Sequence, residues 1–310
     1  MALNTISPMP ETLNDFYQSI RQTGLVRRLL ELARDEDLGP GRCDLTAEVC
    51  GSSNRTATAK IMLGADATIA GLAVVPDLLE VFGADIEFHP LAHDGEHHTK
   101  GATLATLTGP LDQIVTAERT ILNLLGRLSG VATLTAEHVE RAGPTCKVFD
   151  TRKTTPGLRV LEKYAVRCGG GHSHRLGLHD AVLIKDNHIA HLGPDQLATW
   201  LTEVCTKARS EKAAFVEVEV DTLIQFDCVL DVPAGLIDYV LLDNMDPATL
   251  RTAVTMRTNR DSAIELEASG GVRLDTIAEI AATGVDRVSV GALTHQAVTT
   301  DVRLDIEPGA

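Results

Sequence analysis

The sequence predicts an α/β protein in which an N-terminal α/β sandwich domain containing an antiparallel sheet precedes an incomplete (β/α) barrel. Three observations favour this fold class. Strand-like pieces separated by glycine, aspartate and proline occupy residues 56–108. After Pro144, short apolar runs alternate with amphipathic helical stretches, as in a parallel sheet built from βα units. The length of 310 residues suits one large domain with a smaller one.

The first regular element is expected at Leu13–Arg34, where apolar residues recur at helical spacing. The acidic residues that follow, with Gly39 and Pro40, are typical of a helix end, so we expect one amphipathic helix. The alternating segments 57–63 and 102–107 then predict strands of the antiparallel sheet.

Helical spacing returns at Thr116, which we expect to cap a helix running through Val131. We place the domain junction near this helix. The predicted N-terminal sandwich domain therefore covers residues 1–128 and is joined by the tail 294–310. The incomplete barrel, carrying the active site, covers residues 129–293.

Six apolar runs in the second half of the chain are each interpreted as a barrel strand. Their spacing fits a strand plus its crossover helix. Polar residues follow most of these runs, and in a βα barrel the carboxyl ends of the strands form one mouth where chemistry is assembled. Because six runs are evident, we expect an incomplete barrel; the runs are 147–149, 182–184, 215–220, 239–242, 264–266 and 288–290.

The overall charge excludes some partners. The chain has 28 Lys and Arg against 43 Asp and Glu, a formal net charge of −15, so we expect no binding of nucleic acid or of an anionic membrane surface. Neither a signal peptide nor a bilayer-spanning apolar run is evident. The six cysteines form no C-x-x-C pair, and a cytoplasmic location is expected.

The segment Arg152–Lys185 reverses this charge, with seven basic and two acidic residues. A solvated helix face is the simpler interpretation of a basic run. However, Arg152, Lys153 and Lys185 follow predicted strands, and Arg175 follows a glycine loop. Because guanidinium groups bind carboxylates and phosphates at two points, the segment predicts a small substrate with more than one anionic group.

Acidic residues form a second candidate group. In the run Val216–Asp221 acids alternate with valines, which places Glu219 on one face of a buried strand. Asp243 ends the next strand. Facing the mouth, these carboxylates would suit Mg²⁺ or sugar hydroxyls. Salt bridges to the nearby lysines and arginines are an alternative that is compatible with the first interpretation.

Glycines at two late strand ends form the third group, Ser269-Gly270-Gly271 and Val290-Gly291-Ala292. Their backbone N–H groups could hold a phosphate. Ordinary turn glycines are the alternative.

One string of residues is highly specific: Asp150-Thr151-Arg152-Lys153-Thr154-Thr155-Pro156-Gly157-Leu158-Arg159, followed by Gly169 to Arg175 and by Leu183 to Ile189. Together with the motifs above, it resembles the quinolinate phosphoribosyltransferase family, and the resemblance covers nearly the whole chain. One departure from many bacterial members is Ser173, where asparagine is usual.

The resemblance implies Mg²⁺-dependent phosphoribosyl transfer from phosphoribosyl pyrophosphate to quinolinate, with decarboxylation, giving nicotinate mononucleotide, pyrophosphate and CO₂ for NAD synthesis. It implies a homodimer in which Arg119 reaches into the neighbouring subunit's site. It also implies roles for particular residues: Arg152, His174, Arg175 and Lys185 hold the carboxylates, Lys153 lies near the pyrophosphate, Glu219 and Asp243 face ribose and metal, and Ser269, Gly270, Gly271, Gly291 and Ala292 hold the 5-phosphate.

Thr151 and Val290 complete the predicted substrate-binding set, and the predicted catalytic residues are Lys153, Lys185, Glu219 and Asp243. Two other functions stay open. One is a Schiff-base lyase with Lys185 or Lys153 as nucleophile. The other is a non-catalytic or specialised paralogue, similar to the molybdenum-transport-associated relative of this family.

Overall fold

The computed structural model describes residues 12–50 and 55–307. Its residues cluster into two compact units. The sandwich unit takes the described residues up to Ala136, together with Thr154–Gly170 and the residues from Leu293 onward. The barrel unit takes Glu137–Lys153 and Gly171–Ala292. Neither unit is one continuous segment of the chain.

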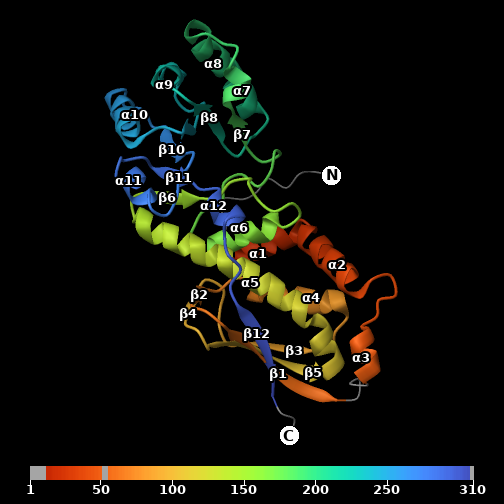
Figure 1. The fold of residues 1–310 in the computed structure, drawn as a ribbon. Coiled ribbons are helices and arrows are strands. Elements are labelled where there is room, and N and C mark those ends of the chain that lie inside the picture. Colours follow the sequence, from red (N-terminus) through yellow and green to blue (C-terminus); the bar gives the residue numbers. More distant parts are fainter. Residues whose placement is uncertain (1–11, 51–54, 308–310) are drawn as a thin grey trace. The chain divides into compact units, whose positions relative to one another are not determined.

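The sandwich unit is built on a four-stranded antiparallel sheet of order β12-β1-β5-β3 (Figure 1). Inward positions of β1 alternate along the strand, and Ala59, Ile61 and Leu63 are fully buried. The predicted antiparallel sheet is therefore confirmed. The strands are β1 (Thr56–Leu63), β3 (Glu87–Pro90), β5 (Thr103–Pro110) and β12 (Val302–Ile306), with a separate pair β2 (Ala67–Thr68) and β4 (His97–His98).

Helices α4 and α5 lie over this sheet in Figure 1. The helices that begin in or belong to the unit are α1 (Leu13–Gln22), α2 (Leu25–Leu38), α3 (Leu45–Cys50), the 3₁₀ turn η2 (Leu72–Val74), α4 (Val75–Phe82), α5 (Leu111–Ala142) and α6 (Arg159–Cys168). Among the described residues, none of the helices combines the length and the apolar character needed to cross a membrane.

The prediction of a single helix over Leu13–Arg34 is wrong. The chain breaks into α1 and α2 at Gly24, which adopts a left-handed conformation with φ of 74°. Glycine reaches this conformation without steric cost, so a helix can stop there although the apolar spacing continues. The second helix also runs beyond Arg34 to Leu38.

The prediction that Thr116 caps a helix is also wrong, because α5 begins five residues earlier at Leu111. Thr116 lies inside the helix, and its hydroxyl donates to Asp44 Oδ2 at 2.8 Å. The predicted apolar face is confirmed, since Ile121, Leu125 and Val131 on it are buried.

Two glycines on α5 permit a close crossing with the C-terminal segment. A Cβ at Gly130 would lie 2.0 Å from the carbonyl oxygen of Val298, and one at Gly126 would lie 2.7 Å from that of Thr300. The Thr300 N–H donates to the Gly126 carbonyl at 2.9 Å. The missing side chains therefore let this backbone rest directly on the helix.

We expect Gly130→Ala to lower the free energy of unfolding by about 1–3 kcal/mol, because backbone rather than a flexible side chain must move aside. Urea unfolding measures the change. Gly41→Ala is the matched control, since its Cβ would meet only Cys43 Cβ at 4.0 Å. An equal effect of the two substitutions would contradict the close crossing.

The barrel unit contains a six-stranded, fully parallel sheet of order β6-β11-β10-β9-β8-β7. All six predicted runs form strands, and the predicted incomplete barrel with parallel strands is confirmed as the fold class. The strands are β6 (Lys147–Phe149), β7 (Val182–Ile184), β8 (Val216–Val220), β9 (Tyr239–Asp243), β10 (Glu265–Ser269) and β11 (Arg287–Ser289).

Helices connect these strands, as the crossover rule for parallel strands requires (Figure 1). They are α6 between β6 and β7, then α7 (Asp186–Ile189), α8 (Pro194–Ser210), α9 (Leu223–Leu230), α10 (Pro247–Asn259) and α11 (Ile277–Ala281) between the later strands. Helix α12 (Ala292–His295) follows the last strand of the sheet, β11. The interior of the sheet is dense with valine and leucine: Val218, Val240 and Leu266 are fully buried. This buried packing holds the carboxyl ends of the strands in place.

Candidate active site

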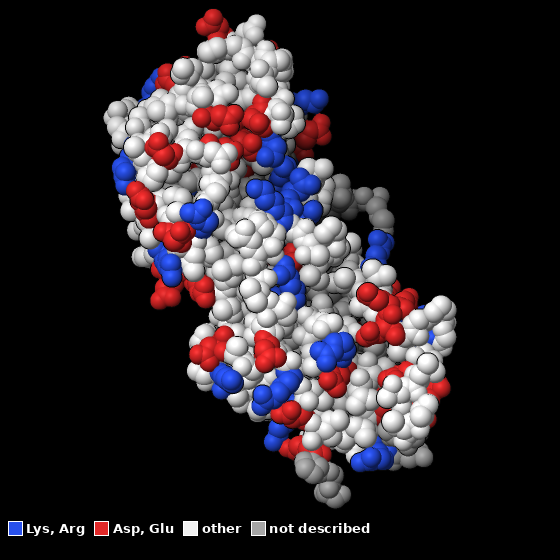
Figure 2. All heavy atoms as spheres, viewed as in Figure 1, with Lys and Arg blue, Asp and Glu red and all other residues white. Residues whose placement is uncertain are grey.

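The carboxyl ends of the barrel strands bring most predicted site residues to one edge of the sheet. Lys153 follows β6, Lys185 follows β7, Glu219 lies near the end of β8, and Asp243 and Ser269 end β9 and β10. Parallel strands in one sheet share this edge. Figure 2 shows Lys and Arg side chains gathered next to Asp and Glu on the part of the surface formed by the barrel unit.

Lys185 and Glu219 form an ion pair, with Nζ and Oε2 separated by 2.6 Å. Strand register explains the pairing. Ile184 at the end of β7 lies opposite Val218 in β8, so the residues that follow them, Lys185 and Glu219, are neighbours. Burial raises the pKa of Glu219, and Lys185 opposes the rise. The salt bridge predicted as an alternative is therefore present.

Asp243 shares this electrostatic environment. Burial raises the pKa of its carboxyl group first and Asp221 raises it further, whereas Lys185 and Lys153 act in the opposite direction. Glu219 is buried and Asp243 is half-buried, and each lies near other carboxylates, whose repulsion a hard cation would relieve. Glu219 and Asp243 therefore have the donor chemistry that fits Mg²⁺.

Asn244 fixes the Asp243 carboxylate. Its Nδ2 donates to Asp243 Oδ2 at 2.6 Å, and its N–H donates to the Ser269 carbonyl at 2.9 Å. Asn244 has a positive φ of 54°, and a Cβ at Gly270 would lie 2.1 Å from its Oδ1. The glycine loop after β10 is thus built against the residue that orients Asp243.

The loop Ser269-Gly270-Gly271 takes a shape that few other residues could adopt. Gly270 and Gly271 have φ of 90° and 61°. Nothing lies within 4 Å of a Cβ built at Gly271, so there is open space beside it. At the second predicted phosphate loop, the Val290 N–H donates to the Phe149 carbonyl at 2.9 Å, Gly291 follows, and Ala292 is the first residue of α12.

Arg175 is a buried cation that is repelled by the positive charge of Arg152. The residue is 8% exposed, and Nη1 donates to the carbonyl oxygen of Ala181 at 3.4 Å. Burial lowers the pKa of its guanidinium group, and the charge of Arg152 lowers it further. Two cations that repel each other in a partly desolvated place favour binding of an anion between them.

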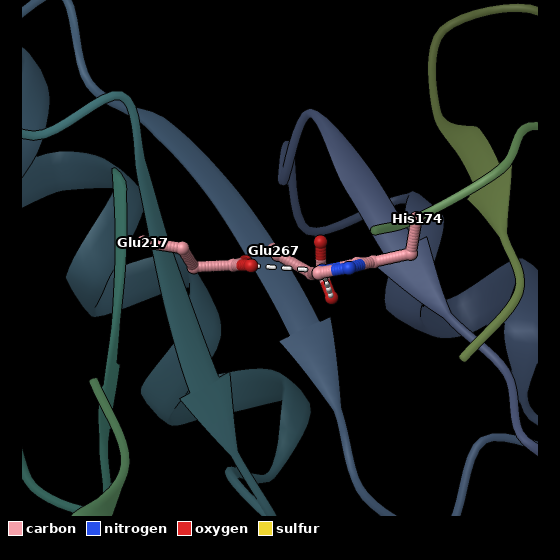
Figure 3. A group of neighbouring side chains, drawn as sticks. All are labelled: His174, Glu217 and Glu267. Atoms are coloured by element: carbon pink, nitrogen blue, oxygen red, sulfur yellow. Dashed lines mark ion pairs between the residues drawn. The ribbon is translucent and has the colours of Figure 1, made fainter. Parts of the chain in front are cut away.

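His174 lies deeper, inside the barrel. Its Nε2 is 2.8 Å from Glu217 Oε2 and 3.7 Å from Glu267 Oε1 (Figure 3). Its Nδ1 accepts a hydrogen bond from the Arg175 N–H at 2.8 Å. Both ring nitrogens are therefore engaged within the protein, and the predicted contact of His174 with a substrate carboxylate stays a prediction.

Arg287 completes this buried cluster, which we call the charged quartet: His174, Glu217, Glu267 and Arg287. Its Nε is 2.6 Å from Glu267 Oε2 and its Nη2 is 3.1 Å from Glu217 Oε1. The guanidinium also lies over the ring of Tyr239, 3.4 Å from the centroid.

The two acids of the quartet differ in pKa. Burial opposes ionisation of Glu217, but His174 and Arg287 outweigh it and hold its pKa below the usual range. Burial and the neighbouring Glu217 raise the pKa of Glu267. The acidic neighbours also raise the pKa of His174 against the effect of its burial.

The charged quartet does not fit a Mg²⁺ ion, although ligand atoms of His174, Glu217 and Glu267 lie within 4.8 Å of one another. Arg287 already supplies a cation to both carboxylates. Mg²⁺ also prefers an all-oxygen octahedral shell that keeps several waters, which a fully buried group with an imidazole does not offer. Glu219 and Asp243 are the better candidates.

Two further predicted residues have clear places. Thr151 Oγ1 accepts from the Lys153 N–H at 2.9 Å and so shapes the turn after β6. Arg119 lies on α5 in the sandwich unit, with its side chain 65% exposed and 3.8 Å from Glu118. An exposed side chain of this length is available to reach another molecule.

Sequence reasoning did not single out Glu267, Arg287 or the side chain of Asp150, and it identified Asn244 only as a polar residue at the end of a predicted strand. The one available signal was charge inside apolar runs: Glu267 is flanked by Leu266 and Ala268, and Arg287 directly precedes Val288. Such inward charges on neighbouring strands indicate a buried ion-pair network.

Comparison with known proteins shows the family to which the chain belongs. Residues 131–305 match the family described as quinolinate phosphoribosyl transferase, C-terminal domain, and residues 44–129 match its N-terminal domain. The nicotinate-nucleotide pyrophosphorylase (carboxylating) of Mycobacterium leprae is 41% identical over 288 residues, which cover 90% of this chain and 96% of that protein. A probable enzyme of the same name from Bacillus subtilis is 36% identical, with 91% and 93% covered.

Among solved structures, the nicotinate-nucleotide pyrophosphorylase of Francisella tularensis superposes with a TM-score of 0.81 at 32% identity. The match covers 99% of this chain and 100% of that one.

Proposed function

Because the chain belongs to the quinolinate phosphoribosyltransferase family, we propose that it transfers the phosphoribosyl group of phosphoribosyl pyrophosphate to quinolinate with loss of CO₂. The products are nicotinate mononucleotide, pyrophosphate and CO₂, and the reaction serves NAD synthesis. The observation that carries the proposal is the repelling pair Arg152 and Arg175 beside the Lys185–Glu219 ion pair. Both substrates are small polyanions that such a site attracts.

In this reaction the protein chiefly orients two anions that repel each other. Arg152, Arg175 and Lys185 hold the quinolinate carboxylates. The loops Ser269–Gly271 and Gly291–Ala292 hold the 5-phosphate. When pyrophosphate leaves, positive charge develops on the ribose, and the carboxylates of Glu219 and Asp243 stabilise it while Lys153 neutralises the leaving group.

The pyridine nitrogen then bonds to the anomeric carbon and becomes quaternary. The ring can now accept the electron pair of the bond to the 2-carboxylate, so CO₂ leaves and the ring carbon takes a proton from water. We propose that Glu219 and Asp243 hold Mg²⁺, which when bound neutralises charge on the pyrophosphate.

The decisive experiment incubates the purified protein with quinolinate, phosphoribosyl pyrophosphate and Mg²⁺. Nicotinate mononucleotide and labelled CO₂ should appear in equal amounts, and chelation of Mg²⁺ should stop both. Formation of neither product would overturn the proposal and favour a non-catalytic paralogue. The Schiff-base alternative has less support, because Lys185 Nζ is engaged by Glu219 Oε2 at 2.6 Å and is not free to attack a carbonyl carbon. Borohydride trapping of a carbonyl substrate on Lys185 or Lys153 would revive it.

The proposed active unit is a homodimer in which Arg119 reaches the site of the other copy. Its exposed position on α5 supports this arrangement. We expect Arg119→Ala and Arg175→Ala proteins to be nearly inactive alone. After mixing and exchange, half of the dimers are hybrids with one intact site, so activity should recover to about a quarter of the unmodified level. Continued inactivity despite demonstrated exchange would contradict the shared site.

We also propose a cytoplasmic location. All six cysteines are free thiols, as expected in a reducing compartment. Cell fractionation with an antibody to the protein tests this proposal.

A further inference from the structure

Asp150 is a fully buried carboxylate at the point where β6 ends and the basic loop begins. Its Oδ1 accepts the N–H of His174 at 2.8 Å. Its own N–H donates to the carbonyl of His172 at 3.0 Å. One residue therefore contacts the segment that leads to Arg175 through both its backbone and its side chain.

These bonds continue a sheet. The His172 N–H donates to the Val148 carbonyl at 2.8 Å, and Phe149 and His172 form a parallel bridge with their rings stacked 5.1 Å apart. Two residues further along the same segment, the His174 N–H donates to the carboxylate of Asp150 instead of to a main-chain carbonyl. The carboxylate thus extends the ladder beyond the last main-chain pair.

We propose that Asp150 is a positioning residue for the quinolinate site, which sets the separation of the two loops that carry Arg152 and Arg175. The inference rests on the proposed function. Arg152 follows Asp150 by two residues, and Arg175 directly follows His174. The Asp150–His174 hydrogen bond therefore links the two chain segments within two residues of each arginine.

Electrostatics make such a link necessary. Arg152 and Arg175 repel each other, and without a link their loops would separate until the repulsion fell. A dicarboxylate needs both cations at a fixed spacing, because two-point contacts weaken steeply with misplacement.

Asp238 offers a matched control, since its carboxylate also accepts a main-chain N–H, but at the amino ends of the strands, away from the predicted site. It precedes β9, and its Oδ2 accepts the N–H of Val216 at the start of β8 at 2.7 Å. It also pairs with Arg209 at 2.7 Å. Loss of Asp238 should weaken the sheet without touching the loops at the carboxyl ends.

The test compares Asp150→Ala, Asp150→Asn and Asp238→Ala by steady-state kinetics, by calorimetric binding of quinolinate and by thermal unfolding. We expect Asp150→Ala to raise the quinolinate KM and dissociation constant about 10- to 100-fold, with the KM for phosphoribosyl pyrophosphate changed less than about twofold. Asp150→Asn should restore most of the affinity, because an amide oxygen can accept the same N–H. Asp238→Ala should lower the melting temperature and leave the quinolinate KM unchanged.

Equal effects of Asp150→Ala and Asp238→Ala on the quinolinate KM would overturn the inference, as would equal rises in both substrate KM values. If Asp150→Ala does not fold, Asp150→Ser replaces it, because its short hydroxyl cannot reach His174 and should give the same selective loss. The activity of the unmodified protein distinguishes failure of the proposed function from failure of the Asp150 inference. An inactive protein refutes the proposed function, whereas an active protein with a normal Asp150→Ala variant refutes this inference alone.

Discussion

Arg287→Met is expected to lower the free energy of unfolding by about 3–5 kcal/mol, because it leaves Glu217 and Glu267 buried beside each other without their guanidinium partner. Because methionine retains much of the apolar stem of arginine, the loss of unfolding free energy reports mainly on removal of the guanidinium charge. Urea unfolding at pH 7 measures it. Arg303→Met, which removes an exposed pair with Asp305, is the control and should cost far less.

The loss should depend on pH with a definite sign. Burial and Glu217 already raise the pKa of Glu267 in the folded protein, and removal of Arg287 raises it further. A carboxyl group with a raised folded-state pKa stabilises the fold below its unfolded pKa and loses that contribution as pH rises through the folded value. The variant should therefore be weakest, relative to the unmodified protein, above neutral pH and recover toward pH 5. A deficit that stays constant with pH would contradict the quartet's charge pairing.

Arg175→Ala is expected to lower kcat/KM for quinolinate by about 10²- to 10³-fold, because it removes a buried cation that we propose binds a quinolinate carboxylate. The same change should leave the ligand-free protein at least as stable, since burial and Arg152 both disfavour the Arg175 charge. Quinolinate should raise the melting temperature of the unmodified protein and not that of the variant.

Arg251→Ala, on the exposed surface of α10, is the control for Arg175→Ala and should change neither measurement. A destabilised Arg175→Ala protein with normal quinolinate kinetics would show that Arg175 has a structural role instead of a binding role.

The strand pattern of the barrel unit could be predicted because each strand is a short apolar run ending in polar residues. Lys185 and Glu219 were placed at one mouth for the same reason, and strand register brings them into contact. The break at Gly24 was missed because apolar spacing continues across it and only the left-handed backbone shows the turn. The start of α5 was missed because Leu111 directly follows Pro110, the last residue of a strand.

The charged quartet was beyond prediction for a different reason. Glu217 and Arg287 are far apart in the chain, and a single sequence shows that each is an isolated charge in an apolar run without showing which strands are neighbours. Strand order decides the partners. The role of Asp150 depends in the same way on the segment at His172 joining the edge of β6.

Because each unit is made of separate segments of the chain, the two units cannot be completed in the order in which they begin during synthesis. Strand β1 leaves the ribosome early, yet Leu63 pairs with Val302 in β12, so its edge stays open until almost the whole chain has emerged. The barrel unit, bounded by Ala292, has all its strands before then. The unit that is started first is therefore completed last, and its exposed β1 edge is the place where a chaperone or another nascent chain would act.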